Sequence, residues 1–386
     1  SPSAPADRAR TGPAMTTTTD SAERDAELRA LREAVQDLVA GCGGTAAARR
    51  QLDSGSGIDE DAWRLLGREM GLAGLGIAEE AGGAGGGVAE LTVVAEELGR
   101  SLLPVPFFSS TVLAGQVLAE CPDTGELLAR MSAGETRAAF AGVDADGCWQ
   151  PDRLPVSAER VDGSWRLSGT APFVLDGAGA DHLVVAAGTA DGCDVFLVAA
   201  DEADVDLRGV TALDPTRGQA VATFTGATAT ALTSDASGGH VVGRAMDVAL
   251  VVLAAEQIGG AAACLDMAVD YAKIRQQFSR PIGSFQSIKH KLADLLLQVE
   301  MGRSALDRAL LGAGDPDRLA EAAAVAEIWC SDAFTVVATE NVHVNGGTGF
   351  TWEHDAHLYF RRARADEVLL GDAAVHRERL AALLGW

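Results

Sequence analysis

The spacing of apolar residues divides the chain into three stretches. Over residues 21–132 apolar side chains recur every three or four positions, which is the period of amphipathic helices. Over residues 133–236 the apolar runs are short, rich in β-branched residues and separated by Gly, Asp and Pro, which indicates seven or eight antiparallel strands. Helical periodicity returns over residues 237–386. The pattern predicts an α+β protein with an N-terminal all-α domain, a middle antiparallel β-domain and a C-terminal α-helical domain.

The remaining stretch, residues 1–20, has a different composition. It is rich in Pro, Ser, Thr and Ala and has no apolar centre, so we expect a disordered leader. The longest apolar segment of the chain, Val248 to Leu265, contains Glu256 and Gln257 and therefore predicts a buried helix rather than a membrane span.

Charge and cysteine content exclude several classes of function. The net charge of −24 argues against a nucleic-acid partner. The six cysteines form no CxxC pair and have no close histidine, so neither a disulfide framework nor a metal site is expected. Reduced thiols suit a cytoplasmic protein.

One basic segment stands out in this acidic chain: Tyr271 to Glu300, with the sequence YAKIRQQFSRPIGSFQSIKHKLADLLLQVE. Two helical patterns flank a corner at Pro281 and Gly283. As far as Arg303 the segment has six cations and two anions, a local surplus of +4. Arginine donors suit a pyrophosphate, although an ordinary solvated helix face would have the same composition.

A second segment contains closely spaced glycines. The turn Gly346-Gly347-Thr348-Gly349 follows a predicted helix over Glu321 to Asn341. Such a turn lets backbone amides approach a cofactor, but it is equally a common helix-to-helix connection.

Together these segments resemble the signatures of a known family. The basic segment, the run from His343 to Phe350 and the following TWEHDAHLYFRRARADEVLLGD are similar to motifs of the acyl-CoA dehydrogenases. The TWEHDAHLYF and LLGD elements resemble an actinobacterial subgroup that forms heteromeric enzymes and lacks the usual catalytic Glu. The resemblance implies a C-terminal four-helix bundle, FAD as cofactor, and α,β-desaturation of an acyl-CoA or carrier-bound acyl thioester. It also implies an electron-transfer flavoprotein or similar acceptor.

The resemblance also implies specific cofactor-binding residues. Arg275, Phe278 and Gln286 match residues that reach a neighbouring subunit's FAD in the family. His343, Gly346 and Gly347 match the glycine turn beside the cofactor, although relatives often have Gln at the position of His343. Because the flavin is shared between subunits, we expect a homo-oligomer or a heterotetramer with a Glu-bearing acyl-CoA dehydrogenase subunit.

The catalytic base of the family has no clear counterpart. Desaturation requires a carboxylate that removes the α proton of the thioester. The position of the usual Glu is occupied by Leu370, and the alternative position one helix earlier falls near Ala249. Asp372 and Glu256 are the nearest substitutes, but a helix-end carboxylate and a salt bridge are alternative roles for them. Glu367 is expected to pair with an arginine.

The flavin-contacting strands also depart from the family pattern. The stretch AGVDADGCWQPD replaces the usual TEPGAGSD-like stretch, and Phe173-Val174-Leu175 replaces Trp-Ile-Thr. Leucine cannot supply the hydroxyl hydrogen bond that threonine offers to a flavin nitrogen.

Three functional hypotheses follow. The chain is an active desaturase with an unconventional base, or it is the base-deficient subunit of a heteromeric dehydrogenase. Alternatively, it is an acyl-CoA dehydrogenase-like tailoring enzyme of secondary metabolism that uses the flavin for another redox reaction.

Overall fold

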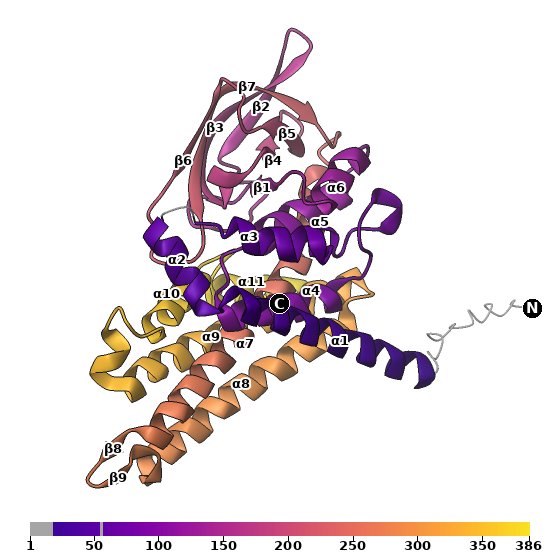
Figure 1. Ribbon diagram of the computed structural model, residues 1–386. Coiled ribbons are helices and arrows are strands. Elements are labelled where there is room, and N and C mark those ends of the chain that lie inside the picture. Colours follow the sequence, from indigo (N-terminus) through magenta and orange to yellow (C-terminus); the bar gives the residue numbers. More distant parts are fainter. Residues whose placement is uncertain (1–17, 55–56) are drawn as a thin grey trace, which may run out of the picture.

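The computed structural model describes residues 18–54 and 57–386 (Figure 1). The predicted leader therefore lies largely outside the described residues. The first described helix, α1, begins at Thr18, so the last residues assigned to the leader belong to a helix instead.

The N-terminal part of the described chain is helical, as predicted from the apolar spacing. Asp59 caps its third helix, where the carboxylate accepts a hydrogen bond from the amide of Ala62. The helices and helical turns are α1 (Thr18–Cys42), α2 (Thr45–Ser54), α3 (Glu60–Trp63), η1 (Arg64–Glu69), η2 (Leu72–Gly74), η3 (Glu79–Ala81), α4 (Val88–Ser101), η4 (Phe107–Ala114), α5 (Gly115–Ala119) and α6 (Gly125–Ser132).

A seven-stranded sheet follows in the chain. Its strands are β1 (Ala138–Ala141), β2 (Val156–Val161), β3 (Ser164–Leu175), β4 (His182–Gly188), β5 (Cys193–Ala199), β6 (Val205–Gly209) and β7 (Gln219–Ala231), with a short turn η5 (Gly177–Gly179) after β3. The strand order is β1-β4-β2-β3-β7-β5, β6 pairs with β7, and β5 also pairs with β4, so that five of the strands form a closed ring. The expectation of a purely antiparallel domain is wrong in one detail, because β4 runs parallel to both β1 and β2.

The C-terminal part is dominated by three long helices. They are α7 (Gly238–Ile274), α8 (Gln286–Gly312) and α9 (Pro316–Asn345), and α9 packs against both α7 and α8. The shorter elements are β8 (Gln276–Gln277), β9 (Arg280–Pro281), η6 (Ile282–Ser284), η7 (Gly346–Phe350), α10 (Ala356–Asp366) and α11 (Ala373–Leu383). Helices α10 and α11 both pack on α9 and complete the helical layer, which confirms the predicted α+β fold.

The long apolar helix is part of the protein core. Helix α7 is long and apolar enough to span a membrane, as is the stretch Pro316–Phe350. Within α7, however, 89% of the most apolar window is buried inside the protein. Residues Val251 to Ala255 are fully buried, so the prediction of a core helix over Val248 to Leu265 is confirmed.

Helices α4 and α7 approach each other at two glycines. A Cβ atom added to Gly99 on α4 would lie 2.0 Å from the carbonyl oxygen of Glu256 on α7. Reciprocally, a Cβ atom added to Gly259 on α7 would lie 2.0 Å from the carbonyl oxygen of Glu96 on α4. Because the obstacles are backbone atoms, rotation of a side chain cannot relieve them. The two glycines therefore set the spacing between the N-terminal helices and the C-terminal helices.

This contact generates a stability prediction. Replacing Gly259 with alanine forces α4 and α7 apart, and we expect the free energy of unfolding to fall by about 1–3 kcal/mol. Gly243 lies on the same helix, and an added Cβ there meets no atom within 4 Å. Gly243→Ala should leave stability unchanged or raise it by up to about 1 kcal/mol through helix propensity. Urea unfolding of both variants checks this, and equal stabilities would contradict the close-packing argument.

Candidate functional site

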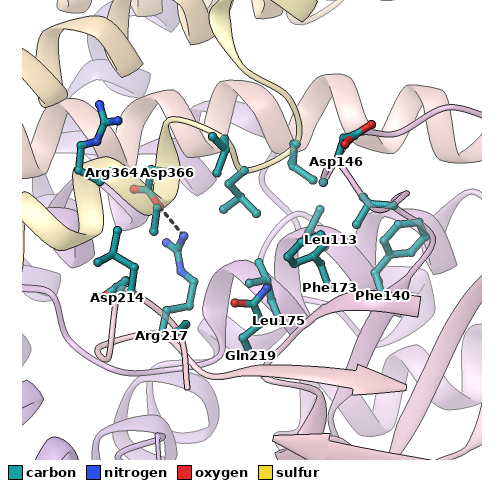
Figure 2. Close-up of a pocket in the computed structure, with 18 residues that line it drawn as sticks. Leu113, Phe140, Asp146, Phe173, Leu175, Asp214, Arg217, Gln219, Arg364 and Asp366 are labelled. Atoms are coloured by element: carbon teal, nitrogen blue, oxygen red, sulfur yellow. Dashed lines mark hydrogen bonds and ion pairs between the residues drawn. The ribbon is translucent and has the colours of Figure 1, made fainter. Parts of the chain in front are cut away.

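A pocket of about 250 Å³ lies between the sheet and the C-terminal helices (Figure 2). We call it the central pocket. Phe173 and Leu175 at the end of β3 form one wall, and Val368 to Leu370, after α10, form the wall opposite. Phe140 on β1 closes one end, where its ring makes an edge-to-face contact with Trp149 at 6.3 Å between centroids. Most of the pocket surface is therefore apolar and partly aromatic.

Charged side chains gather at the opposite end of the central pocket. Arg217, in the segment before β7, donates to Asp366 at the end of α10 at 2.7 Å, the contact drawn as a dashed line in Figure 2. Arg217 also pairs with Glu256 on α7. Arg362 on α10 pairs with the same Glu256 at 2.5 Å and with Asp214. These five side chains, which we call the buried ion-pair cluster, connect the sheet to two C-terminal helices.

The buried ion-pair cluster has two guanidinium groups and three carboxyl groups. Burial raises the pKa of Asp366 to about 7, although Arg217 acts in the opposite direction. Burial also acts to raise the pKa of Asp214, but Arg362 and Arg217 outweigh it and the net shift is downward. Oδ2 of Asp366 has no hydrogen-bond partner. Asp366 is therefore expected to titrate near neutral pH.

The structure places both candidate bases in other roles. Glu256 is buried as predicted, but it contacts two arginines and lines a separate hollow of only about 20 Å³. Asp372 caps α11, where its carboxylate accepts hydrogen bonds of 2.9 Å from the amides of Ala374 and Val375. Glu367 pairs with Arg364, the arrangement expected from the sequence. None of these positions favours proton abstraction from a ligand in the central pocket.

Leu370 itself faces the central pocket. It is buried and has a left-handed backbone with φ of +62°, followed by Gly371 at +109°. The ring of His376 lies close to Gly371, and burial together with Arg379 lowers its pKa to about 4. The position expected for the catalytic carboxylate is thus occupied by an isobutyl group beside a neutral imidazole.

The predicted cofactor residues of the basic segment lie on a projecting hairpin formed by β8 and β9 (Figure 1). Phe278 and Ser279 form its tip, both with positive φ, and the side chain of Phe278 is 88% exposed. Arg280 stacks on Phe285 with its guanidinium 4.1 Å from the ring centroid. Arg275 is exposed and has no ion-pair partner in the described part of the chain.

The other predicted cofactor residues are also on the surface. Gln286, at the start of α8, hydrogen-bonds His290 at 2.8 Å. His343 lies 3.3 Å from the carboxylate of Glu340 near the end of α9. Side chains added at Gly346 and Gly347 would meet no atom within 4 Å, so the backbone of this turn is open to a ligand or neighbour.

The structure therefore separates the predicted residues into two places. All six predicted cofactor residues, on or next to the hairpin and the glycine turn, are outside the central pocket. Of the predicted catalytic positions, only Leu370 lines it. Sequence reasoning missed Arg217, Asp366 and Gln219. These residues belong to no sequence motif. The one feature that could have indicated a site is that they are charged or polar residues at the ends of a predicted strand or helix.

The described residues of the central pocket are compatible with a flat ring system that is apolar at one end and polar at the other. Phe140, Phe173 and Leu370 supply apolar surface, Arg217 lies at the end opposite Phe140, and Gln219 lies between them beside Leu175 (Figure 2). The side chain of Leu175, which the sequence resemblance places where the family has threonine, offers no hydrogen bond. The isoalloxazine of FAD fits this division of the lining.

Comparison with known proteins identifies the class. Residues 25–122 match the acyl-CoA dehydrogenase N-terminal domain, and residues 236–385 match the acyl-CoA dehydrogenase C-terminal domain. The chain therefore belongs to the acyl-CoA dehydrogenase family, whose members are FAD-dependent oxidoreductases that act on the CH–CH bond of acyl-CoA thioesters.

Particular relatives narrow the subgroup. The chain is 36% identical to acyl-CoA dehydrogenase IpdE2 of Mycobacterium tuberculosis over 345 residues, which cover 89% of this chain and 93% of the relative. Its structure is similar to the Tcur3481-Tcur3483 steroid ACAD G363A variant, with a TM-score of 0.85, 32% identity and coverage of 94% of this chain and 98% of the other. It is also similar to the ChsE4-ChsE5 complex of M. tuberculosis, with a TM-score of 0.81, 29% identity and coverage of 96% and 98%. The predicted resemblance to the actinobacterial subgroup is confirmed.

The proton on Asp366 predicts a pH dependence of stability. The folded protein keeps this proton up to about pH 7, whereas the unfolded chain loses it near the ordinary pKa of 3.8. Because the folded state binds the extra proton, its stability falls as the pH rises through this interval. Asp366→Asn cannot titrate and should lose this dependence, so wild type should lose up to a few kcal/mol relative to the variant between pH 5 and pH 8.

Urea unfolding at pH 5, 6, 7 and 8 measures this difference. Asp332→Asn, at an exposed ion pair with Arg377, is the matched control and should keep the wild-type slope. Parallel stability curves for wild type and Asp366→Asn would show that Asp366 is already ionised at pH 5.

Proposed function

We propose that this chain is the base-deficient subunit of a heteromeric acyl-CoA dehydrogenase. The observation that supports this most strongly is Leu370, an apolar side chain that faces the central pocket where the family has its carboxylate. The surrounding carboxyl groups are in ion pairs or a helix cap. Asp366 has an unpartnered Oδ2, but its Oδ1 is paired with Arg217 at the polar end of the pocket, away from the position that the resemblance gives to the family's Glu.

The reaction in the assembled enzyme is desaturation of an acyl-CoA or carrier-bound acyl thioester. Bound FAD would supply the acceptor for the hydride that leaves the β carbon. The α proton goes to a carboxylate, which in this proposal is the Glu of the other subunit. An electron-transfer flavoprotein or similar acceptor then takes the electrons, and the cytoplasm is the expected location.

The contribution of this chain to the neighbour's cofactor comes from its surface. The guanidinium of Arg275, beside the projecting hairpin, has no ion-pair partner among the described residues and is suited to a pyrophosphate. Phe278 presents an aromatic ring that is 88% exposed, and such exposure of a large apolar side chain is typical of contact with a partner. Gly346 and Gly347 leave their backbone accessible beside His343. Gln286 completes the set at the base of the hairpin.

The partner assignment rests on similarity and on the missing base together. Two of the similar structures are named as pairs, Tcur3481-Tcur3483 and ChsE4-ChsE5. A heterotetramer with a Glu-bearing subunit would unite the hairpin of this chain with a complete catalytic site. The tailoring-enzyme alternative is not favoured, because the relatives at over 30% identity are acyl-CoA dehydrogenases.

The test of this proposal is anaerobic bleaching of flavin absorbance by a panel of acyl-CoAs. We expect the purified chain alone to show no bleaching, and the chain co-purified with a Glu-bearing subunit to bleach. In that complex, replacing the partner's Glu with Gln should abolish bleaching. Bleaching of flavin bound to this chain alone would contradict the proposal and direct attention to Asp372 and Glu256.

A second prediction concerns the hairpin. Arg275→Ala should reduce FAD retention in the assembled enzyme, because it removes a charge-assisted contact worth about 1.5–3 kcal/mol, or roughly ten- to a hundredfold in affinity. FAD per complex after gel filtration measures the effect. Arg318→Ala, at an exposed position at the start of α9, serves as the control. Unchanged flavin occupancy with Arg275→Ala would remove this residue from the cofactor site.

A further inference from the structure

Gln219 lies directly beside Leu175, the residue at the position where the family has a threonine that hydrogen-bonds the flavin. It begins β7, and its cross-strand partner in the antiparallel β3–β7 pairing is Leu175. Side chains of directly paired residues lie on the same face of a sheet. Both residues line the central pocket, and Figure 2 shows the carboxamide of Gln219 close to Leu175.

The carboxamide of Gln219 is free to bind a ligand. Its backbone carbonyl accepts a hydrogen bond from Val210, but its side chain has no hydrogen-bond partner within the described chain. The charged side chains of the pocket lining are already paired: Arg217 with Asp366, Asp214 with Arg362, Arg364 with Glu367, and Asp146 with Arg153. The carboxamide of Gln219 is therefore a neutral hydrogen-bond donor in the pocket lining that can bind a ligand.

The lining also limits what such a ligand can be. Phe140, Phe173 and Leu370 favour an apolar body, and a saturated acyl chain would satisfy them. An acyl chain, however, has no acceptor to meet the carboxamide on the pocket wall. A ring system with an apolar end and hydrogen-bonding edge atoms uses both features, and isoalloxazine is such a ring.

We propose that the carboxamide N–H of Gln219 donates a hydrogen bond to the isoalloxazine of FAD bound in this chain's own central pocket. Gln219 would thereby replace, from the adjacent strand, the hydroxyl donor that Leu175 cannot provide. This inference rests on the family's use of FAD and is independent of the heteromeric assembly proposed above. It predicts that the chain binds flavin even though Leu370 leaves that flavin without a base.

Riboflavin is the probe that isolates the ring, because it lacks the pyrophosphate and adenosine of FAD. Titration of the full-length chain is followed by quenching of riboflavin fluorescence and by the shift of its visible absorption band. Gln219→Leu should weaken binding about three- to tenfold, the effect of one neutral hydrogen bond, and should reverse part of the spectral shift. Gln219→Glu has no amide donor and should weaken binding at least as much.

Two further variants distinguish loss of the hydrogen-bond donor from a general disturbance of the fold. Leu175→Thr in the Gln219→Leu background restores a donor on the adjacent strand and should recover affinity and the spectral shift. Gln298→Leu, on α8 and outside the pocket lining, makes the same chemical change elsewhere and should bind riboflavin as wild type does.

The outcomes distinguish this inference from the proposed function. Wild-type affinity in Gln219→Leu, or no riboflavin binding by the wild-type chain, would overturn the role of Gln219 and leave the heteromeric proposal standing. Conversely, a Gln219 effect together with acyl-CoA bleaching by this chain alone would support the flavin contact and overturn the base-deficient assignment. Arg275→Ala should affect FAD and spare riboflavin, because its predicted contact is with the pyrophosphate.

Discussion

The charges buried between the sheet and the C-terminal helices hold the site together. Arg362 is almost completely buried and is stabilised by Asp214 from the segment before β7 and by Glu256 from α7. Removing one partner from such a cluster leaves an uncompensated charge and typically costs about 3–5 kcal/mol. Through Asp214 and Arg217 the cluster also fixes the segment that leads into β7. The position of Gln219 and the polar end of the central pocket therefore depend on these ion pairs.

The same cluster bears on our proposal that the base of the reaction belongs to a partner subunit. Its carboxyl groups are paired with arginines, and Asp366, whose pKa burial raises to about 7, lies against Arg217. Leu370, at the position where the sequence resemblance places the family's carboxylate, adds apolar surface. Binding of a flat ring requires apolar surface, whereas abstraction of a proton requires a proton acceptor placed over the α carbon. In our proposals the lining of this chain binds the ring, and a partner subunit supplies the proton acceptor.

Local sequence patterns predicted much of the fold. The apolar spacing predicted helices before and after a β-region, and the glycine turn and the basic corner were placed correctly at helix ends. Two expectations were wrong: α1 extends back into the predicted leader as far as Thr18, and β4 is parallel to β1 and β2. Strand direction depends on which strands pair, and residue spacing within one strand contains no information about that.

The sequence by itself determined the family, the element types and the absence of glutamate at position 370, because motifs and periodicity are properties of neighbouring residues. The tertiary structure alone decided which side chains share a site. Arg217 meets Asp366 across 149 positions of the chain, and Gln219 meets Leu175 through strand pairing. The pKa of Asp366 likewise follows from burial, which no local pattern reveals. Such contacts arise only when distant segments pack, so spacing along the chain could not have predicted them.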